Sequence, residues 1–328
     1  MRAVLTGIVA GAMALAGGAA LTDLRAGNRA AAAERAFPAE GRMLTVDGLR
    51  LHAVVKGNGP DLVMIHGASG SLRDFTFDLT GRLAPHFRVI AFDRPGLGLS
   101  DAPPDAAVDP RVQAALLRRA AGKLGVRDPL VLGHSYGGAV AMAWALAAHD
   151  RPEAGPRPAG LVLLAGATHP WPGELGPWYR IAATGFGQRV AIPLVSAFAP
   201  ESRVLAVLDS IFAPQPAPPG YAGHIGLGLS LRRDALRANA LQVQGLKPHV
   251  AEMAPRYAAL DLPIEILHGT EDTIVGLSIH SERMASEVSG AALSRMQGIG
   301  HMPHHADPDA VLAAIARAAA RAGLRPGG

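Results

Sequence analysis

The chain has 328 residues, of which 49% are hydrophobic and 18% are charged, so it can bury a full core and is not intrinsically disordered. Its 31 basic and 27 acidic residues give a net charge of +4, and no nucleic-acid type run of Lys and Arg occurs, so we expect no nucleic-acid partner. The absence of cysteine excludes disulfides, thiolate metal sites and a cysteine nucleophile. No sequence pattern indicates an oligomeric state.

The N-terminal segment 3–22 carries no charge and is about as long as a helix that crosses the hydrocarbon core of a bilayer. Three interpretations are open: a cleaved signal peptide with small residues around Ala19 and Ala20, an uncleaved membrane anchor, or a buried core helix. The segment lacks an amphipathic period, which favours export or membrane association. Residues 1–40 are therefore predicted to be a signal peptide or membrane anchor plus a tether.

The orientation of such an anchor depends on the flanking arginines. Arg25, Arg29 and Arg35 follow the segment, whereas only Arg2 precedes it. If the segment stays uncleaved, the positive-inside rule keeps the body on the cytoplasmic face. Cleavage would instead place the body outside the cytoplasm.

From residue 41 the sequence alternates short strands with helices. Residues 42–46 and 49–55 are predicted to form a hairpin, because Asp47-Gly48 between them supplies a tight turn. Apolar runs predict strands that are buried on both faces, as in a parallel sheet covered by helices; these runs are 62–65, 88–92, 130–132, 160–164, 264–267 and 292–296. Helices are predicted at 110–124, 138–149 and 308–322. Asp109 and Asp307 are the expected N-caps of the first and last.

Residues 169–248 break this alternation, because they hold many prolines and most of the aromatic side chains. Their length and apolar content predict an inserted helical subdomain rather than one long irregular connection. The α/β core then consists of residues 41–168 and 249–328, with the insertion between its two parts.

The sequence Gly133-His134-Ser135-Tyr136-Gly137 follows an apolar strand and opens an Ala-rich helix. A Gly-x-Ser-x-Gly motif in this setting is typical of a nucleophile elbow, in which a strained turn exposes the serine hydroxyl at the edge of the sheet. Ser135 is therefore the candidate nucleophile. The alternative is a glycine-rich turn whose serine only caps the helix.

A serine nucleophile needs a base, and the base needs an orienting acid. His301 lies in a glycine loop after the last predicted strand, and His304 and His305 are neighbouring alternatives. Asp272 directly follows the strand at 264–267, and Glu271 is its nearest rival. Three close histidines could also bind a metal, but no carboxylate or fourth ligand accompanies them at a known spacing, so we expect no metal site.

A glycine-rich turn after the strand at 62–65 is predicted to bind the oxyanion. The backbone amides of Ala68 and Tyr136 are the expected donors. His66, in the same turn, is expected to pack and hydrogen-bond rather than to act in catalysis. No dinucleotide fingerprint, phosphate-binding loop or zinc-protease motif is present, so no cofactor is expected.

Five motifs in this order resemble the α/β-hydrolase superfamily. They are His66-Gly67, the stretch from Asp93 to Asp101 (DRPGLGLSD), the elbow at Ser135, Gly269-Thr270-Glu271-Asp272, and Gly298 to His301. The resemblance implies a mostly parallel sheet with helices on both faces, a Ser135-Asp272-His301 triad, and a helical cap at 169–248. Epoxide hydrolases and dehalogenases of this family carry aspartate at the elbow, so Ser135 argues against both.

The expected function is hydrolysis of a carboxylic ester or lactone through an acyl-enzyme. The cap aromatics indicate a small apolar ester-like substrate. The same triad also serves cofactor-free haloperoxidases (perhydrolases) and carbon–carbon bond hydrolases, and these stay open. A non-catalytic binding protein on the same fold is the third alternative.

Overall fold

The fold is built on one eight-stranded sheet, and the computed structural model describes residues 2–105 and 108–325 of the chain, with the backbone alone at residues 2–12, 14 and 15. The strand order is β1-β2-β4-β3-β5-β6-β7-β8. β2 pairs antiparallel with both β1 and β4, and all other pairs are parallel. The strands are β1 (Arg42–Val46), β2 (Leu49–Lys56), β3 (Asp61–Ile65), β4 (Arg88–Phe92), β5 (Leu130–His134), β6 (Gly160–Leu164), β7 (Ile264–Gly269) and β8 (Ala291–Met296).

The predicted strands and hairpin are confirmed. Asp47 and Gly48, between β1 and β2, have φ angles of 51° and 80°, which is the left-handed backbone that this tight turn requires. Strands β3, β5, β6 and β7 are buried along their whole length. Parallel strands buried on both faces read as continuous apolar runs, and this is why the sequence showed them without alternation.

Two hydrophobic cores lie on the two faces of the sheet, and successive residues of each strand alternate between them. Val63 and Ile65 of β3 enter one core, whereas Leu62 and Met64 enter the other. One face is covered by α4 (Pro110–Lys123), α5 (Tyr136–Asp150), α12 (Leu277–Glu287) and the C-terminal part of α11 (Arg233–Met253). The other is covered by α2 (Arg73–Thr76), α3 (Leu79–Leu83) and α14 (Pro308–Arg321).

Both N-caps expected from sequence are present, whereas α5 begins at Tyr136, two residues before the predicted start at 138. The Asp109 side chain accepts a hydrogen bond from the amide of Arg111, and Pro110 occupies the first turn of α4. Asp307 caps α14 in the same way, through the amide of Ala310. These carboxylates satisfy amides that the first turn of a helix leaves without intrahelical partners.

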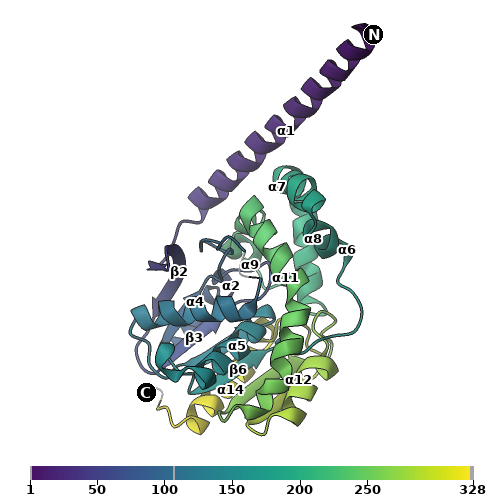
Figure 1. Cartoon of the computed structure of the whole chain (residues 1–328). Coiled ribbons are helices and arrows are strands. Elements are labelled where there is room, and N and C mark those ends of the chain that lie inside the picture. Colours follow the sequence, from purple (N-terminus) through teal and green to yellow (C-terminus); the bar gives the residue numbers. More distant parts are fainter. Residues whose placement is uncertain (1, 106–107, 326–328) are drawn as a thin grey trace.

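The segment between β6 and β7 is mostly helical and stands at the carboxyl edge of the sheet (Figure 1). We call it the cap. Its last helix, α11, continues five residues beyond the predicted boundary at 248, although Pro248 lies inside it. Its elements are α6 (Pro177–Ala182), the π-helix Gly187–Ala191, α7 (Ile192–Phe198), α8 (Glu201–Phe212), α9 (Tyr221–Ile225), α10 (Leu227–Ser230) and α11.

The N-terminus forms one long helix, α1 (Arg2–Ala36), which projects from the body beside α7 (Figure 1). The predicted signal or anchor segment, residues 3–22, lies largely outside the residues whose side chains are described. The following part, expected to be a tether, is helical and bound to the cap: Asp23 pairs with Arg233, and Glu34 with Arg232. These ion pairs join residues about 200 positions apart, so no local sequence pattern indicates them.

In the part of the chain whose side chains are described, no single helix has both the length and the hydropathy of a membrane-spanning helix. One bent pair, Gly187–Phe198 and Glu201–Phe212, meets both criteria together with an angle of 101° between its halves.

Candidate active site

Ser135 sits in a strained turn between β5 and α5, with φ 54° and ψ −119°. The two flanking glycines are required by space. A Cβ on Gly133 would lie 2.3 Å from the carbonyl oxygen of Gly137, and a Cβ on Gly137 would lie 2.1 Å from that of Ile65. The chain therefore turns sharply enough to present the hydroxyl at the carboxyl edge of the sheet, at the N-terminus of α5.

His301 joins Ser135 to Asp272 through two short hydrogen bonds. Its Nε2 lies 2.9 Å from Ser135 Oγ, and its Nδ1 lies 2.7 Å from Asp272 Oδ2. A carboxylate only accepts hydrogen bonds, so Nδ1 carries the proton and Nε2 is free to accept the serine proton. Glu271, the rival acid, is exposed, and Asp272 makes the hydrogen bond to His301.

The Asp272 side chain is completely buried and accepts hydrogen bonds on both oxygens. Oδ1 accepts the amides of Ile274 and Val275, and Oδ2 also lies 3.1 Å from Nε2 of His268. Burial by itself would raise the pKa of this carboxyl, but the hydrogen bonds from His268 and His301 outweigh it and hold the pKa below its usual range. The carboxylate is therefore ionised at neutral pH.

The loop after β3 lies directly against Ser135, since a Cβ on Gly67 would approach Ser135 Cβ to 3.0 Å. Two donors hold the Gly67 carbonyl: His66 Nδ1 at 2.8 Å and Arg94 Nη2 at 3.1 Å. In a trans peptide the carbonyl and the next N–H point in opposite directions, so this anchoring fixes the direction of the Ala68 amide. The Tyr136 amide belongs to the first residue of α5, beside Ser135.

His66 has the structural role expected of it. Its Nε2 accepts the backbone amide of Arg94 at 2.9 Å, which leaves the proton on Nδ1 for the Gly67 carbonyl. Burial and the nearby Arg94 charge lower the pKa of His66 to about 4. It therefore stays neutral and fixes the turn.

Arg94 is a residue of the site that the sequence analysis did not assign. It is fully buried, and its guanidinium lies 4.2 Å from the ring centroid of Tyr136. It also donates to the side-chain oxygens of Gln113 and Gln242. Burial lowers the pKa of Arg94 to about 10, so it remains charged at neutral pH. The sequence feature that could have identified Arg94 is its place in the DRPG motif after β4.

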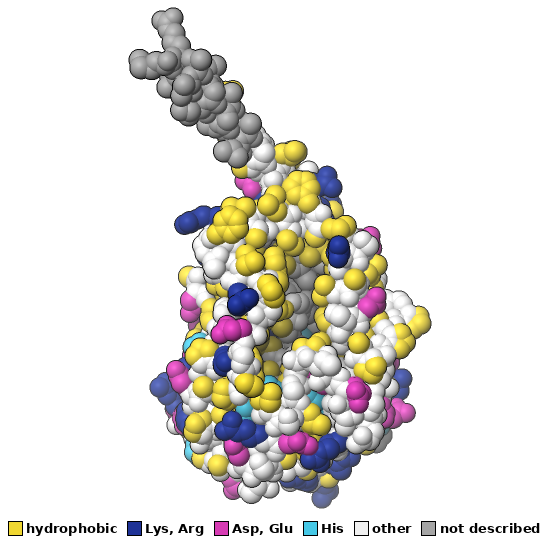
Figure 2. All heavy atoms as spheres, turned by 90° about the vertical axis from the view of Figure 1, so that its right-hand side faces the viewer, with side chains coloured by type: hydrophobic (Ala, Val, Ile, Leu, Met, Phe, Trp, Pro, Cys, Tyr) yellow, Lys and Arg dark blue, Asp and Glu magenta, His cyan; other side chains and the backbone are white. Residues whose placement is uncertain are grey.

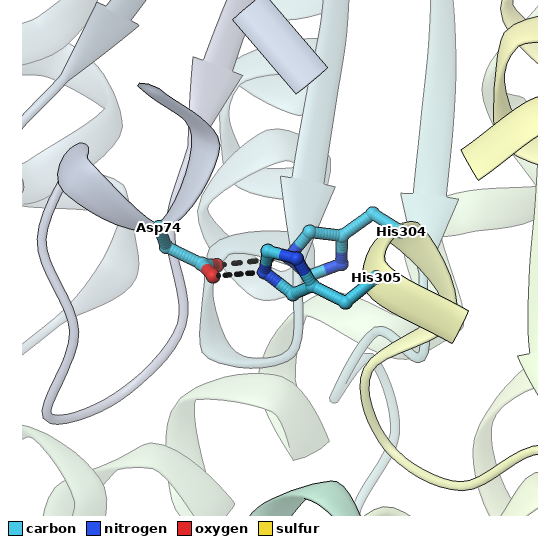
Figure 3. A group of neighbouring side chains, drawn as sticks. All are labelled: Asp74, His304 and His305. Atoms are coloured by element: carbon cyan, nitrogen blue, oxygen red, sulfur yellow. Dashed lines mark hydrogen bonds and ion pairs between the residues drawn. The ribbon is translucent and has the colours of Figure 1, made fainter. Parts of the chain in front are cut away.

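A second buried group adjoins the site, formed by Asp74 of α2 with His304 and His305 of α13 (Pro303–Ala306) (Figure 3). His304 Nε2 lies 3.0 Å from Asp74 Oδ2, and His305 Nε2 lies 2.7 Å from Oδ1. The hydroxyl of Tyr221, from the cap, donates to Oδ1 at 2.7 Å. The group therefore ties together the loop after β3, the histidine loop and the cap.

This group corrects the sequence argument about metals, because Asp74, which lies at no known ligand spacing from the histidines in the sequence, supplies a carboxylate beside them. Asp74, His304 and His305 are the described residues that could hold a metal ion, with one ligand atom of each within 4.8 Å of the others. Three protein donors already satisfy the carboxylate. Burial would raise the pKa of Asp74, but interactions with His304 and His305 hold it well below its usual range.

His134, the residue before the nucleophile, lies between the two groups. Its Nε2 donates to the carbonyl of His301 at 3.0 Å, and its ring centroid lies 4.7 Å from that of His304. Burial lowers the pKa of His134 well below its usual value. A neutral His134 thus holds the backbone of His301.

Comparison with known proteins agrees with this architecture. A family model described as "Alpha/beta hydrolase family" matches residues 62–314. An uncharacterized protein of Mycobacterium tuberculosis is 27% identical over 319 residues, covering 87% of this chain and 86% of that protein. A solved structure of a bacterial membrane phospholipase A matches 98% of this chain and 99% of its own, with TM-score 0.68 and 23% identity. The structure of an esterase from Rhodococcus sp. matches 84% of this chain and 96% of its own, with TM-score 0.61 and 24% identity. At these identities, the two structures support the fold alone.

Proposed function

Because the chain belongs to the alpha/beta hydrolase family, and is therefore a hydrolase, we propose that it cleaves a carboxylic ester or lactone through an acyl-enzyme on Ser135. The observation that carries this proposal is the hydrogen-bonded series from Ser135 Oγ through His301 to Asp272. In that series the nucleophile, base and orienting acid are already in contact.

In the proposed reaction His301 Nε2 takes the proton of Ser135 as Oγ attacks the ester carbonyl. The amides of Ala68 and Tyr136 stabilise the resulting oxyanion, whose charge also benefits from the N-terminus of α5. His301 then protonates the leaving alcohol, or the ring alkoxide of a lactone. Water releases the acid by the reverse sequence, and Asp272 keeps the imidazole in the required tautomer throughout.

The proposed substrate has an apolar acyl group. Met302, directly after His301, packs with Leu208, Phe212 and Tyr221 of the cap. The part of the cap next to the base is therefore apolar, which suits a hydrocarbon chain better than a charged group.

The test uses the purified full chain with p-nitrophenyl esters of graded chain length and a fluorophosphonate probe. We expect turnover and labelling of the unmodified protein, and a loss of several orders of magnitude in kcat for Ser135→Ala. Glu271→Gln is the matched control, because it removes an exposed charge one residue from the proposed acid. Equal turnover by the Ser135→Ala protein would overturn the proposal.

We also propose that residues 3–22 attach the enzyme to a membrane, or direct its export if they are cleaved. The length and the lack of charge of this segment support the proposal. Fractionation with an alkaline carbonate wash tests attachment, and N-terminal sequencing tests cleavage. Recovery of the uncleaved chain in the cytosolic fraction would contradict both.

A further inference from the structure

The cap exposes a row of large apolar side chains, which we call the cap stripe: Phe186, Val190, Leu194 and Phe198. Their exposed fractions are 66%, 39%, 46% and 46%. They recur every four residues along the helical segment 186–198, and side chains at this spacing lie on one side of a helix. The other side of the segment is buried through Gly187, Ile192, Ser196 and Ala197.

The cap stripe lies beside the part of α1 that directly follows residues 3–22. Arg25 Nε donates to the carbonyl of Ala197 at 2.9 Å, and its guanidinium lies 5.2 Å from the ring centroid of Phe198. Arg29 Nη2 donates to the carbonyl of Ala199 at 3.1 Å. The two segments therefore run in the same direction. Leu194, which precedes Ala197, accordingly lies nearer to the end of α1 that adjoins residues 3–22.

Two more leucines extend this apolar surface. Leu21 and Leu24 of α1 are 60% and 62% exposed. Figure 2 shows hydrophobic side chains gathered at the end of the molecule from which the N-terminal helix leaves. Large exposed apolar side chains that line up on one side of a helix, rather than lying scattered singly, indicate an interaction site.

The length of α1 indicates what covers this surface. If residues 3–22 span the hydrocarbon core, Arg25 lies about 4.5 Å beyond its edge, because each helical residue rises about 1.5 Å. The headgroup layer on each side is about 5–8 Å thick, so Arg25 and Phe198 fall at headgroup depth. Arginine and aromatic side chains are suited to that layer.

We propose that the cap stripe, together with Leu21 and Leu24, inserts into the headgroup and upper acyl region of the bilayer that residues 3–22 enter. This docking rests on the membrane attachment proposed above, but not on the chemistry of Ser135. The exposed side of the segment 186–198 then faces the lipid, and its buried side stays packed on the cap. The cap would be held against the lipid, on the same side of the sheet as the hydroxyl of Ser135.

The chain contains no cysteine, which permits a direct depth measurement with single-cysteine variants. The variants are Phe186→Cys and Leu194→Cys, each labelled with a nitrobenzoxadiazole fluorophore in the full chain. Glu153→Cys is the control, because Glu153 is exposed and precedes β6, at the opposite edge of the sheet. The proteins are reconstituted into phosphatidylcholine–phosphatidylglycerol vesicles with and without nitroxide-labelled lipid.

We expect the labels at 186 and 194 to shift to shorter emission wavelength and to lose about half or more of their emission to the nitroxide lipid, while the label at 153 does neither. Protein that floats with the vesicles but shows no quenching at 186 and 194 overturns the docking alone. Protein that fails to float overturns the attachment and the docking together. A blue shift that follows protein concentration without lipid would show that a second copy covers the stripe, which also overturns the proposal.

Discussion

Replacing Asp272 with asparagine tests the proposed mechanism at one atom. Oδ1 of Asp272 accepts two backbone amides, which can only donate, so the asparagine carbonyl must take that position. The NH₂ group is then forced to the Oδ2 position, 2.7 Å from His301 Nδ1 in the present structure. Nδ1 must accept this hydrogen bond, so the imidazole proton moves to Nε2, which faces Ser135. His301 can then no longer take the serine proton.

The expected loss in kcat at pH 7 is about 10⁴-fold, as for the same change in a serine protease triad. That corresponds to about 5 kcal/mol of transition-state stabilisation. The overall structure should persist, because His268 keeps its hydrogen bond to the carbonyl of Val275 at 2.7 Å. Initial rates on p-nitrophenyl esters measure the loss, with Glu271→Gln as the control. A variant that keeps more than about a tenth of kcat would refute the tautomer argument.

Three further predictions concern the residues that support the site. Gly137→Ala should lower the melting temperature sharply, because the added Cβ would lie 2.1 Å from the Ile65 carbonyl oxygen. Gly223→Ala is the control: its added Cβ has no atom within 4 Å, so the melting temperature should stay unchanged. Asp74→Ala should cost about 3–5 kcal/mol in urea unfolding at pH 7, since three buried donors lose their acceptor. The pKa of Asp74 is depressed in the folded protein, so the stability that its carboxylate contributes is present above about pH 4 and lost as the pH falls below it. A difference in unfolding free energy between the two proteins that stayed constant down to pH 3 would contradict this. Arg94→Lys keeps the charge but removes the guanidinium N–H that donates to the Gly67 carbonyl and so orients the Ala68 amide. We expect kcat to fall about 10–100-fold with little change in KM. A change in KM alone would count against the proposed role of the Ala68 amide.

Elements governed by local sequence were predictable. The buried strands follow from continuous apolar runs, the starts of α4 and α14 from Asp109-Pro110 and Asp307-Pro308, and the strained turn at Ser135 from its two glycines. Candidate residues at the carboxyl ends of neighbouring parallel strands were also predictable, because those ends meet at one edge. Asp272 and His301 do meet there, next to Ser135.

The remaining features depend on contacts between distant segments. Asp74 meets His304 and His305 some 230 residues later, and the helix at 23–36 binds cap residues about 170–200 positions away. Such partners leave no periodicity, capping pattern or spacing in the sequence, because each depends on how the packed layers bring side chains together in space. The sequence by itself determined the strands, the elbow and the order of the candidate triad. Only the tertiary structure decided which buried charges neutralise one another and which apolar face of the cap remains exposed.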